Sequence, residues 1–486
     1  MAASDIARSE VQVEAADALV DRAFSRITGS QPVGGNRLRL LRDAKENYPV
    51  WLEAIAGARH TIHFENYIFA DDEAGRPFAE ALIDRARAGV RVRVLYDWFG
   101  CFVYSRSRFW RRLAAAGVEV RAFNQPSPIA PFHALSRNHR KVITVDGRIS
   151  FVSGLCIARS WVGVPGKTEP WRDTGVALEG PAVFDVESAF AETWAESGPP
   201  LPLGEVEARG LPVETSGGRV RVLKGRPGQL NTYRSDQLVA AAATRTLWLT
   251  DAYFVATTAF VQALTTAARD GVDVRLLVPG TSDVPLMQSL VQTNYRPLLE
   301  SGIRVFEWNG PMLHAKTAVA DGRWCRIGST NLNLTSWLTN WELDVTIDDP
   351  AFAADMEAMF LEDIEGATEV VLKAHSPTGL SETGRGKART MKRQGGRLAA
   401  GAVGLGSTAR AAITNTRQLS ATETQVVAKI GLSLLAIAFI AFALPGILIY
   451  PVVISLAWLG IWLIVRAWRL RDAHEAREGA REAREG

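Results

Sequence analysis

The amino-acid sequence predicts a duplicated α/β fold, a sandwich of two similar lobes, followed by a C-terminal transmembrane helical hairpin. Three observations predict this architecture. Several segments of the first half recur in the same order in the second half. In both halves, helix-like stretches that end at glycine alternate with short strands rich in Val, Ile and Leu. Near the C-terminal end, a long apolar run contains no charged residue.

Length and composition exclude several classes of protein. The 486 residues exceed the ~250–300 residues at which a single hydrophobic core stops growing, so two domains or a duplication are expected. A net charge of +3 argues against a nucleic-acid coat protein, which would carry a large basic excess. Cys101, Cys156 and Cys325 form no CxxC pair, so the sequence predicts neither a zinc site nor disulfides, and it favours a reducing compartment.

The repeats and the linkers between them define the expected domains. The matching segments, first half against second, are Thr61–Phe69 with Thr246–Phe254, Ala86–Leu95 with Ala268–Leu277, and Gly117 with Gly302. A Pro/Gly-rich stretch separates the halves, and a stretch rich in Gly, Ser, Lys and Arg follows them. The predicted order is an N-terminal helical extension (1–35), the first half (36–197), a linker (198–218), the second half (219–375), a basic flexible linker (376–425), membrane helices (426–468) and a charged tail (469–486).

The apolar run predicts the topology of the chain in a membrane. No charged residue occurs from Ile430 to Val465, and Pro445 with Gly446 interrupts the run near its middle. A bilayer is spanned by ~20 residues, so two short membrane helices or a re-entrant hairpin fit better than a buried core helix. Basic residues flank both ends, and the positive-inside bias then predicts a cytoplasmic catalytic part. The acidic N-terminus lacks the features of a secretory signal peptide.

One chemical motif, HxKx4D followed by glycine, occurs in both halves, at His139–Gly147 and His314–Gly322. A histidine and a lysine two residues apart on a strand project from the same face. Asp-Gly predicts a tight turn into a second strand, so each motif is expected to form a β-hairpin. A single copy would be weak evidence, but two copies in matching positions indicate one active site. The candidate catalytic residues are His139, Lys141, Asp146, His314, Lys316 and Asp321.

Further candidates follow each hairpin. Small residues at Ser153–Cys156 and Gly328–Asn331 suit close approach of the backbone to an anion. An acid next to tryptophan comes later in each half, and a carboxylate bonded to the far ring nitrogen of a histidine would fix its tautomer. The candidate phosphate-binding and supporting residues are Asn331, Ser329, Ser153, Asp173 and Glu342.

These residue types suit the cleavage of a phosphodiester. Two lysines neutralise the phosphate, one histidine attacks phosphorus, and the other protonates the leaving oxygen and later deprotonates the incoming hydroxyl. The sequence does not tell which histidine attacks. Because lysines and histidines supply the charge that the reaction needs, we expect neither a metal nor a cofactor, and activity should survive chelators.

From about Asn36 to Leu372 these motifs resemble the phospholipase D superfamily. Three segments, Asn138–Gly147, Trp171–Val183 and Gly328–Asn333, are similar to the bacterial cardiolipin synthases. The resemblance implies phosphatidyl transfer between phosphatidylglycerol molecules through a phosphohistidine, at a site between the two lobes. It also implies that Asp146 and Asp321 are structural, and that the protein lies at the bacterial inner membrane. Phospholipid and the bilayer are the expected partners, nucleic acid is not, and the oligomeric state stays open.

The sequence departs from the family pattern in three respects. Cys156 stands where the family usually has the asparagine that Asn331 supplies in the other half, so the site is expected to be asymmetric. Asn333 and Thr335 replace the usual Asp and Arg, which leaves the acceptor open. The membrane segment is C-terminal, whereas many of these synthases have theirs at the start.

Three other functions share some of these features. A hydrolytic phospholipase D differs only in that water resolves the phosphoenzyme. A nucleic-acid phosphodiesterase would need a basic groove and would leave the membrane segment unexplained, and a non-catalytic scaffold would not need intact His, Lys and Asp in both halves. An aromatic stretch after a predicted strand is either core packing or a rim that dips into the lipid interface. It comprises Trp98, Phe99, Phe102, Tyr104 and Trp110.

Overall fold

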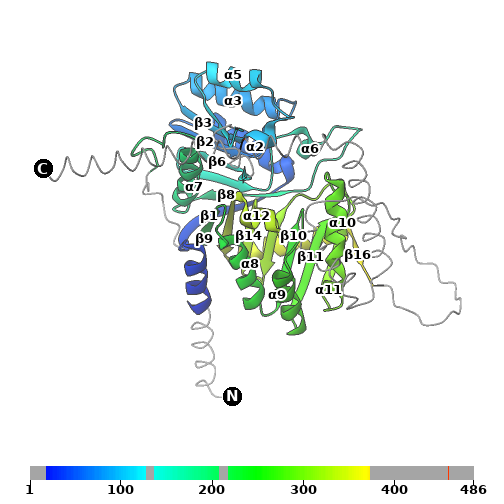
Figure 1. Cartoon of the computed structure of the whole chain (residues 1–486). Coiled ribbons are helices and arrows are strands. Elements are labelled where there is room, and N and C mark those ends of the chain that lie inside the picture. Colours follow the sequence, from blue (N-terminus) through cyan, green and yellow to red (C-terminus); the bar gives the residue numbers. More distant parts are fainter. Residues whose placement is uncertain (1–17, 127–135, 207–216, 373–457, 459–486) are drawn as a thin grey trace, which may run out of the picture. The chain divides into compact units, whose positions relative to one another are not determined.

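The computed structural model describes residues 18–126, 136–206, 217–372 and Trp458. The chain divides into two units, Met1–Arg397 and Leu398–Gly486, and the described part of the first unit contains both halves of the duplication (Figure 1). The predicted basic linker, membrane helices and charged tail lie outside the described residues, Trp458 apart. Among the residues that are described, no helix is both long enough and apolar enough to cross a bilayer.

The two halves contain the same succession of strands. The first half consists of β1 (Val33–Arg42), α2 (Asp43–Ala56), β2 (Thr61–Asn66), α3 (Gly75–Arg87), β3 (Arg91–Asp97), α4 (Trp98–Cys101), α5 (Ser107–Ala115), β4 (Glu119–Phe123), β5 (Arg137–Asn138), β6 (Val142–Val145), β7 (Ile149–Ser153), α6 (Arg159–Val162), β8 (Thr174–Glu179) and α7 (Val183–Glu196). The second half consists of β9 (Gly218–Gly225), α8 (Asn231–Ala242), β10 (Thr246–Asp251), α9 (Thr258–Arg269), β11 (Asp273–Pro279), α10 (Pro285–Thr293), α11 (Tyr295–Leu299), β12 (Arg304–Trp308), β13 (Lys316–Ala320), β14 (Trp324–Gly328), α12 (Leu334–Leu338), β15 (Asn340–Asp348), α13 (Pro350–Glu365) and β16 (Ala367–Val370).

The order of strands in the sheet repeats as well. The first half runs β1-β8-β7-β6-β2-β3-β4 and the second runs β9-β15-β14-β13-β10-β11-β12, with β16 added at its edge. In each half the last three strands of this order are parallel, as expected for strands linked by helical crossovers, and the others are antiparallel. The antiparallel pair β1–β9 joins the halves. The predicted duplicated α/β fold is confirmed at this level.

Hydrophobic clusters fill each lobe and also the region between the lobes. One lies under α2, α3 and α5 in the first lobe, and another under α8, α9 and α11 in the second. A third contains residues of both halves, including Val152 and Val176 from the first and Val222 and Val345 from the second, covered by α7 and α13. Because this core is shared, burial of apolar surface fixes one lobe against the other and thereby the site between them.

Local sequence signals account for several boundaries. α3 and α9 are each followed by a glycine, Gly89 and Gly271, with φ of +87° and +96°, the left-handed conformation that ends helices. The predicted domain limits differ slightly from the elements. Residues 18–28 are helical, but β1 begins at Val33, inside the predicted N-terminal extension, and β9 begins at Gly218, the last residue of the predicted linker.

Candidate active site

The segment that carries His139 pairs with the second half of the chain. β5, directly before this histidine, runs parallel to the start of β15, and the His139 amide donates to the carbonyl oxygen of Trp341 at 2.9 Å. The next residue of β15 is Glu342. His139 Nδ1 donates to its buried carboxylate at 2.9 Å. The first histidine is therefore oriented by an acid from the second half.

The second histidine is held in the reciprocal way. The His314 amide donates to the carbonyl oxygen of Arg172 at 2.7 Å, and His314 Nδ1 donates to the Asp173 carboxylate at 2.8 Å. The Trp161 indole also donates to Asp173, at 2.9 Å. Each predicted acid thus supports the histidine of the other half, a crossing that the sequence alone did not predict.

This pairing sets the tautomer of both imidazoles. An ionised carboxylate can only accept a hydrogen bond, so Nδ1 carries the proton and Nε2 keeps its lone pair. Burial lowers the pKa of His139 and lowers that of His314 to about 4, and nearby lysines lower both further. Both rings are therefore neutral near pH 7, with Nε2 suited to nucleophilic attack.

The two lysines lie beside their own histidines and affect those of the other half. Lys141 and Lys316 are buried, and each ammonium donates to the carbonyl oxygen of the histidine two residues before it. Burial lowers the pKa of both, that of Lys316 to about 8. Lys316 lowers the pKa of His139 and Lys141 that of His314, so the four groups act within one electrostatic site.

The motif aspartates lie at the far end of each hairpin. Asp146 and Gly147 have φ of 55° and 61°, which gives the type I′ turn that the Asp-Gly sequence predicted. The Asp146 carboxylate accepts hydrogen bonds from the amides of Arg59, His60 and Thr61 at 2.7–2.9 Å. Burial raises its pKa, but these bonds outweigh burial and lower it.

Asp321 accepts the equivalent amide bonds just before β10, from Thr244, Arg245 and Thr246. The structure therefore does not place Asp146 and Asp321 at the imidazoles, although both were counted among the candidate catalytic residues. Each carboxylate instead fastens a hairpin turn to the start of the neighbouring strand.

The small residues after each hairpin approach carboxylates of the protein itself. A methyl group on Gly154 would collide with the Asp173 carboxylate, and one on Gly328 would collide with that of Asp344. Ser329 Oγ donates to Glu342 at 2.6 Å, and Ser153 Oγ accepts from the Leu155 amide. Ser329 thus holds the Glu342 carboxylate, and Ser153 stabilises its own loop.

Asn331 and Cys156 occupy equivalent places in the two loops. The Asn331 amide nitrogen donates to Ser336 Oγ at 3.4 Å, and its buried Oδ1 has no hydrogen-bond partner among the described residues. If the oxygen and nitrogen of this side-chain amide were exchanged, the NH₂ group would occupy the position of the unpartnered Oδ1 and could donate a hydrogen bond there. Burial raises the pKa of the Cys156 thiol and keeps it neutral, so an amide stands on one side of the site and a neutral thiol on the other.

Aromatic side chains that the sequence reasoning missed enclose the imidazoles. The Tyr67 ring packs edge-on against His139 with ring centroids 5.0 Å apart. Tyr253 packs similarly against His314 at 6.0 Å, and Trp161 at 5.2 Å. Both tyrosines stand within the repeated segments Thr61–Phe69 and Thr246–Phe254, and their place just after β2 and β10 was the signal available.

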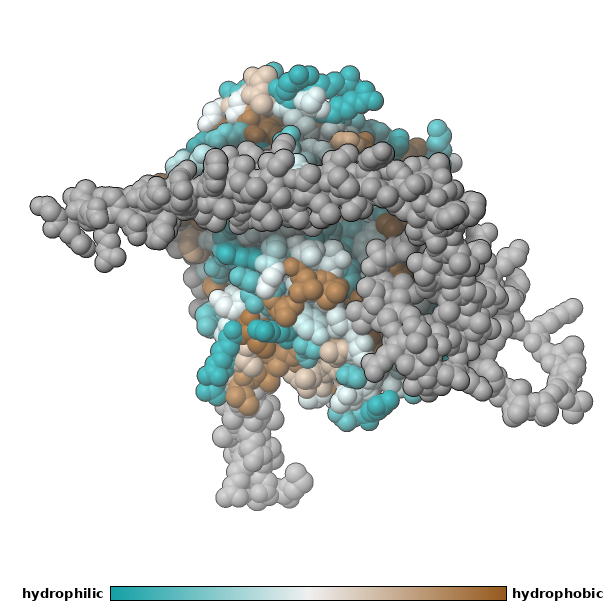
Figure 2. Space-filling model, in the orientation of Figure 1, coloured by the Kyte–Doolittle hydropathy of each residue, from teal (hydrophilic) through white to brown (hydrophobic). Residues whose placement is uncertain are grey.

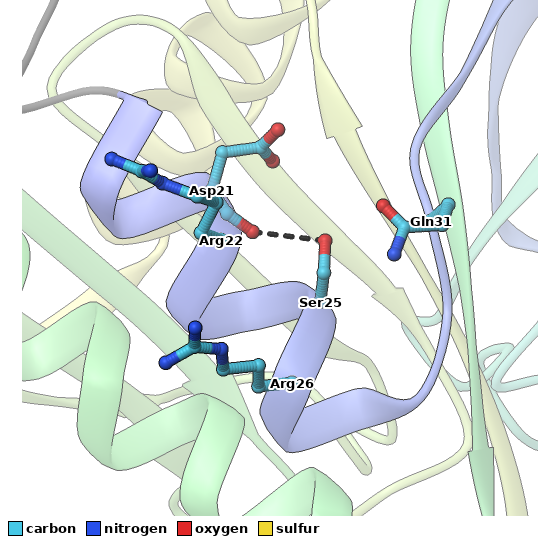
Figure 3. Close-up of a pocket in the computed structure, with 5 residues that line it drawn as sticks. All are labelled: Asp21, Arg22, Ser25, Arg26 and Gln31. Carbon is cyan, nitrogen blue, oxygen red and sulfur yellow. Dashed lines mark hydrogen bonds between the residues drawn. The ribbon is translucent and has the colours of Figure 1, made fainter.

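Two surface hollows lie away from the two motifs. Figure 3 shows one beside the N-terminal helix, where Ser25 Oγ donates to the carbonyl oxygen of Asp21 at 2.9 Å and Gln31 faces them from the following chain. None of its lining residues belongs to the two motifs. Within the described ranges, no group of three His, Cys, Asp or Glu side chains is placed to hold a metal ion.

A duplicated sheet with two histidine–lysine motifs and crossed acids defines the phospholipase D class. Residues 51–162 and 238–364 match the family model described as cardiolipin synthase, PLD-like domain. Cardiolipin synthase A of Pseudomonas aeruginosa strain PAO1 is 32% identical over 355 residues, 72% of this chain and 71% of that protein. Cardiolipin synthase A of Pseudomonas fluorescens strain SBW25 is 33% identical over 355 residues, covering 72% and 73%.

The chain belongs to the cardiolipin synthase family and is thus a transferase of the phospholipase D superfamily. Among solved structures, phosphatidylserine synthase of Haemophilus influenzae Rd KW20 superposes with a TM-score of 0.58 over 72% of this chain and 92% of that one. At 14% identity this similarity concerns the fold alone.

Proposed function

We propose that this protein transfers a phosphatidyl group from one phosphatidylglycerol molecule to another through a phosphohistidine, which yields cardiolipin and glycerol. The observation that carries the proposal is the crossed support of the two histidines, His139 by Glu342 and His314 by Asp173. It leaves each histidine with a lone pair on Nε2, and a buried lysine lies two residues after each histidine. The family of the chain and the names of its relatives support phosphatidylglycerol as the substrate.

The reaction proceeds in two displacements at phosphorus. In the first, Nε2 of one histidine forms a bond to phosphorus while the bond to the glycerol oxygen breaks, and the other histidine gives that oxygen a proton. In the second, the glycerol hydroxyl of another phosphatidylglycerol attacks phosphorus, its proton passes to the second histidine, and the N–P bond breaks. Lys141 and Lys316 stabilise the charge on the phosphoryl oxygens in both steps.

The charges around the two histidines determine which of them carries a proton at each step. The nucleophile must be neutral, and the lowered pKa of both histidines provides this in the free protein. The acid must carry a proton, and the negative phosphodiester favours its protonated form once the substrate lies beside it. Binding of the substrate thus prepares the second histidine for the role of acid.

The decisive assay uses vesicles of labelled phosphatidylglycerol and the full chain. We expect labelled cardiolipin and free glycerol in equal amounts. Phosphatidic acid in place of cardiolipin would mean that water resolves the phosphoenzyme, and that the protein is a hydrolase. His139→Ala and His314→Ala are each expected to abolish turnover, because nucleophile and acid come from different halves. A near-normal rate in either variant would show that the two motifs do not form one site.

We also propose that the segment 426–468 forms two membrane helices in the bacterial inner membrane, with the catalytic part on the cytoplasmic side. The uncharged run from Ile430 to Val465 and the basic residues on both flanks support this topology. Protease added to sealed right-side-out vesicles is expected to leave the catalytic part intact, whereas protease added to inverted vesicles is expected to digest it. The opposite pattern would refute the proposed orientation.

A further inference from the structure

Four large apolar side chains are exposed together directly after β3. Phe99, Phe102, Val103 and Tyr104 are 54%, 64%, 80% and 41% exposed. We call these four residues the apolar cap. Trp110, from the same aromatic stretch, is instead buried and stacks on Tyr96. The aromatic stretch therefore has a buried part, which belongs to the core, and the apolar cap, which no other described residue covers.

Tight contacts fix the segment that carries the apolar cap beside the candidate active site. The Gly100 amide donates to the Asp97 carboxylate at 2.9 Å, and a methyl group on Gly100 would collide with the carbonyl oxygen and ring of Tyr67. The Phe69 amide donates to the buried Cys101 sulfur at 3.3 Å. Since the Tyr67 ring packs against His139, the buried side of this segment contacts the wall of the site, while the apolar cap is exposed.

The equivalent segment of the second lobe also borders the site. It follows β11, where Val284 is 42% exposed, and the preceding Asp283 accepts a hydrogen bond from the Tyr253 hydroxyl at 2.7 Å. Burial is the main cause that raises the pKa of Tyr104, and the Asp283 carboxylate of the second lobe adds to it. The segment after β3 contacts Tyr67 beside His139, and the segment after β11 contacts Tyr253 beside His314, so each segment borders one histidine of the site.

The segment that carries the apolar cap is basic, although Asp72 and Asp283 from other segments also lie near Tyr104. From Trp98 to Val118 the sequence contains four arginines and no acid. Arg106, Arg108 and Arg111 are exposed, and the Arg137 guanidinium lies 4.3 Å from the centroid of the Phe99 ring. Figure 2 shows mainly hydrophilic side chains at the top of the first lobe, where α3 and α5 lie. Aromatic side chains edged by arginine suit an anionic lipid surface, where rings enter the head-group region and guanidinium groups bind phosphates.

We propose that the apolar cap inserts into an anionic bilayer and holds the entrance of the active site against it, so that the diacyl substrate reaches the histidines without leaving the lipid. This rests on the proposed function, and it assigns the docking of the catalytic part to a surface other than the C-terminal apolar segment. Insertion also removes the exposed apolar area from water.

Insertion is tested on the full chain with a probe at the apolar cap. Val103→Cys, labelled with an environment-sensitive fluorophore, is expected to shift to the blue and to be quenched by lipid-borne quenchers on phosphatidylglycerol vesicles. The native cysteines are buried, so labelling is selective. Leu203→Cys, a linker residue that is fully exposed, is the matched control and is expected not to respond. Equal responses at both positions, or none at Val103→Cys, would overturn the proposal.

The same probe identifies any other occupant. A fluorophore at Val103→Cys that is shielded before vesicles are added would place residues 373–486, another copy of the chain or a protein partner on the apolar cap. That result would overturn the proposal. Vesicles of zwitterionic lipid are expected to give a smaller shift than anionic ones, because the arginines find less negative charge. Equal shifts on both lipids would refute the predicted role of the arginines.

Turnover separates this inference from the proposed function. Phe102→Ser combined with Val103→Ser is expected to lower the rate on phosphatidylglycerol vesicles about tenfold, because two inserted apolar side chains are lost. The rate on a soluble short-chain phosphodiester is expected to stay within about twofold. Leu361→Ser, 40% exposed on α13, is the matched control. Unchanged vesicle rates would overturn the docking role alone, whereas failure of the unaltered protein on both substrates would refute the proposed function.

Discussion

At the scale of single residues, two glycines make room for the carboxylates beside them. Gly154→Ala would push a methyl group into the Asp173 carboxylate, which is held between His314 and Trp161. We expect kcat to fall about 100-fold without unfolding, since displacements of about 1 Å have that effect. Steady-state kinetics with circular dichroism test this. Gly34→Ala, where the new methyl group meets only the Arg219 side chain at 3.9 Å, is the control and should stay near the unaltered rate.

The pKa of Lys316 predicts a pH profile. Burial lowers this pKa to about 8, so the free protein loses the positive charge as the pH rises through that value. We therefore expect kcat/KM on a soluble phosphodiester to fall above about pH 8. Lys316→Arg, whose side chain stays charged, is expected to be slower at its optimum and to lack this alkaline decline. A flat profile up to pH 10 in the unaltered protein would contradict the assignment.

The sequence was sufficient to predict the two histidine–lysine motifs as the candidate site but not the partners of the histidines. Each motif forms the predicted hairpin, but His139 and Lys141 precede β6 and His314 precedes β13, so that only Lys316 lies on a hairpin strand. The crossing of the acids could not be predicted, because it depends on the pairing of β5 with β15, whose paired residues are 203 positions apart. The enclosing tyrosines were missed, although their matching place just after β2 and β10 was an available signal.

At the scale of the elements, each hairpin turn is held by an aspartate that was first counted as catalytic. Asp146→Asn keeps the shape and tolerates positive φ, but replaces charge-assisted bonds to three amides with neutral ones. We expect the free energy of unfolding to fall by about 1–2 kcal/mol, while kcat at low temperature stays within about threefold. Denaturant titration and kinetics on the same sample measure both. A large loss of kcat at unchanged stability would restore the catalytic role.

A second prediction concerns a buried cluster of charged residues that joins β2, α7 and the linker. It consists of His63, Arg93, Glu187 and Glu205, and we call it the clamp. His63 lies buried 3.0 Å from both Glu187 and Glu205, and Arg93 also pairs with Glu205. Burial opposes the charged imidazole, but the two carboxylates outweigh it and raise the pKa of His63. We expect His63→Gln to lower the free energy of unfolding by about 3 kcal/mol, measured in urea at pH 6.

The pH dependence of this clamp has a definite sign. Because the pKa is raised in the folded state, its contribution to stability is complete below the unfolded value of about 6.5. It is lost as the pH rises through the folded value. The difference between the unaltered protein and His63→Gln should therefore shrink at alkaline pH. The exposed His60→Gln is the control, and an equal effect at both positions would contradict the clamp.

Strands and hairpins were the elements most accessible from the sequence. β7 runs from Ile149 to Ser153, directly after the turn, where the Asp-Gly sequence predicted a second strand. The linker was less accessible. Its Pro/Gly content predicted a linker between the halves, yet Glu205 is buried and pairs with His63 and Arg93 of the first lobe. Amino-acid composition indicates the conformational preference of a segment as a whole, but it does not show that a single residue of the segment is held by a buried ion pair.

At the scale of the whole molecule, we expect the catalytic unit to work without the C-terminal part. A chain that ends at Leu372 keeps both motifs, both loops and both acids. Its rate on a soluble short-chain phosphodiester should stay within about twofold, while its rate on vesicles at physiological salt should fall at least about tenfold. Sedimentation with vesicles and paired assays measure this. Loss of activity on the soluble substrate would place residues beyond 372 in the catalytic fold.

The crossed pairing also restricts how the two halves can change over generations. A substitution at Asp173 is felt at His314, and one at Glu342 is felt at His139, so a fault inherited in one half disables the reactive group of the other. Neither half can therefore accumulate mutations as a spare copy, as a duplicated segment ordinarily can. Selection acts on the two as a single heritable unit. Only positions outside these two acid–histidine pairs are free to differ between the halves, such as Cys156 and its equivalent Asn331.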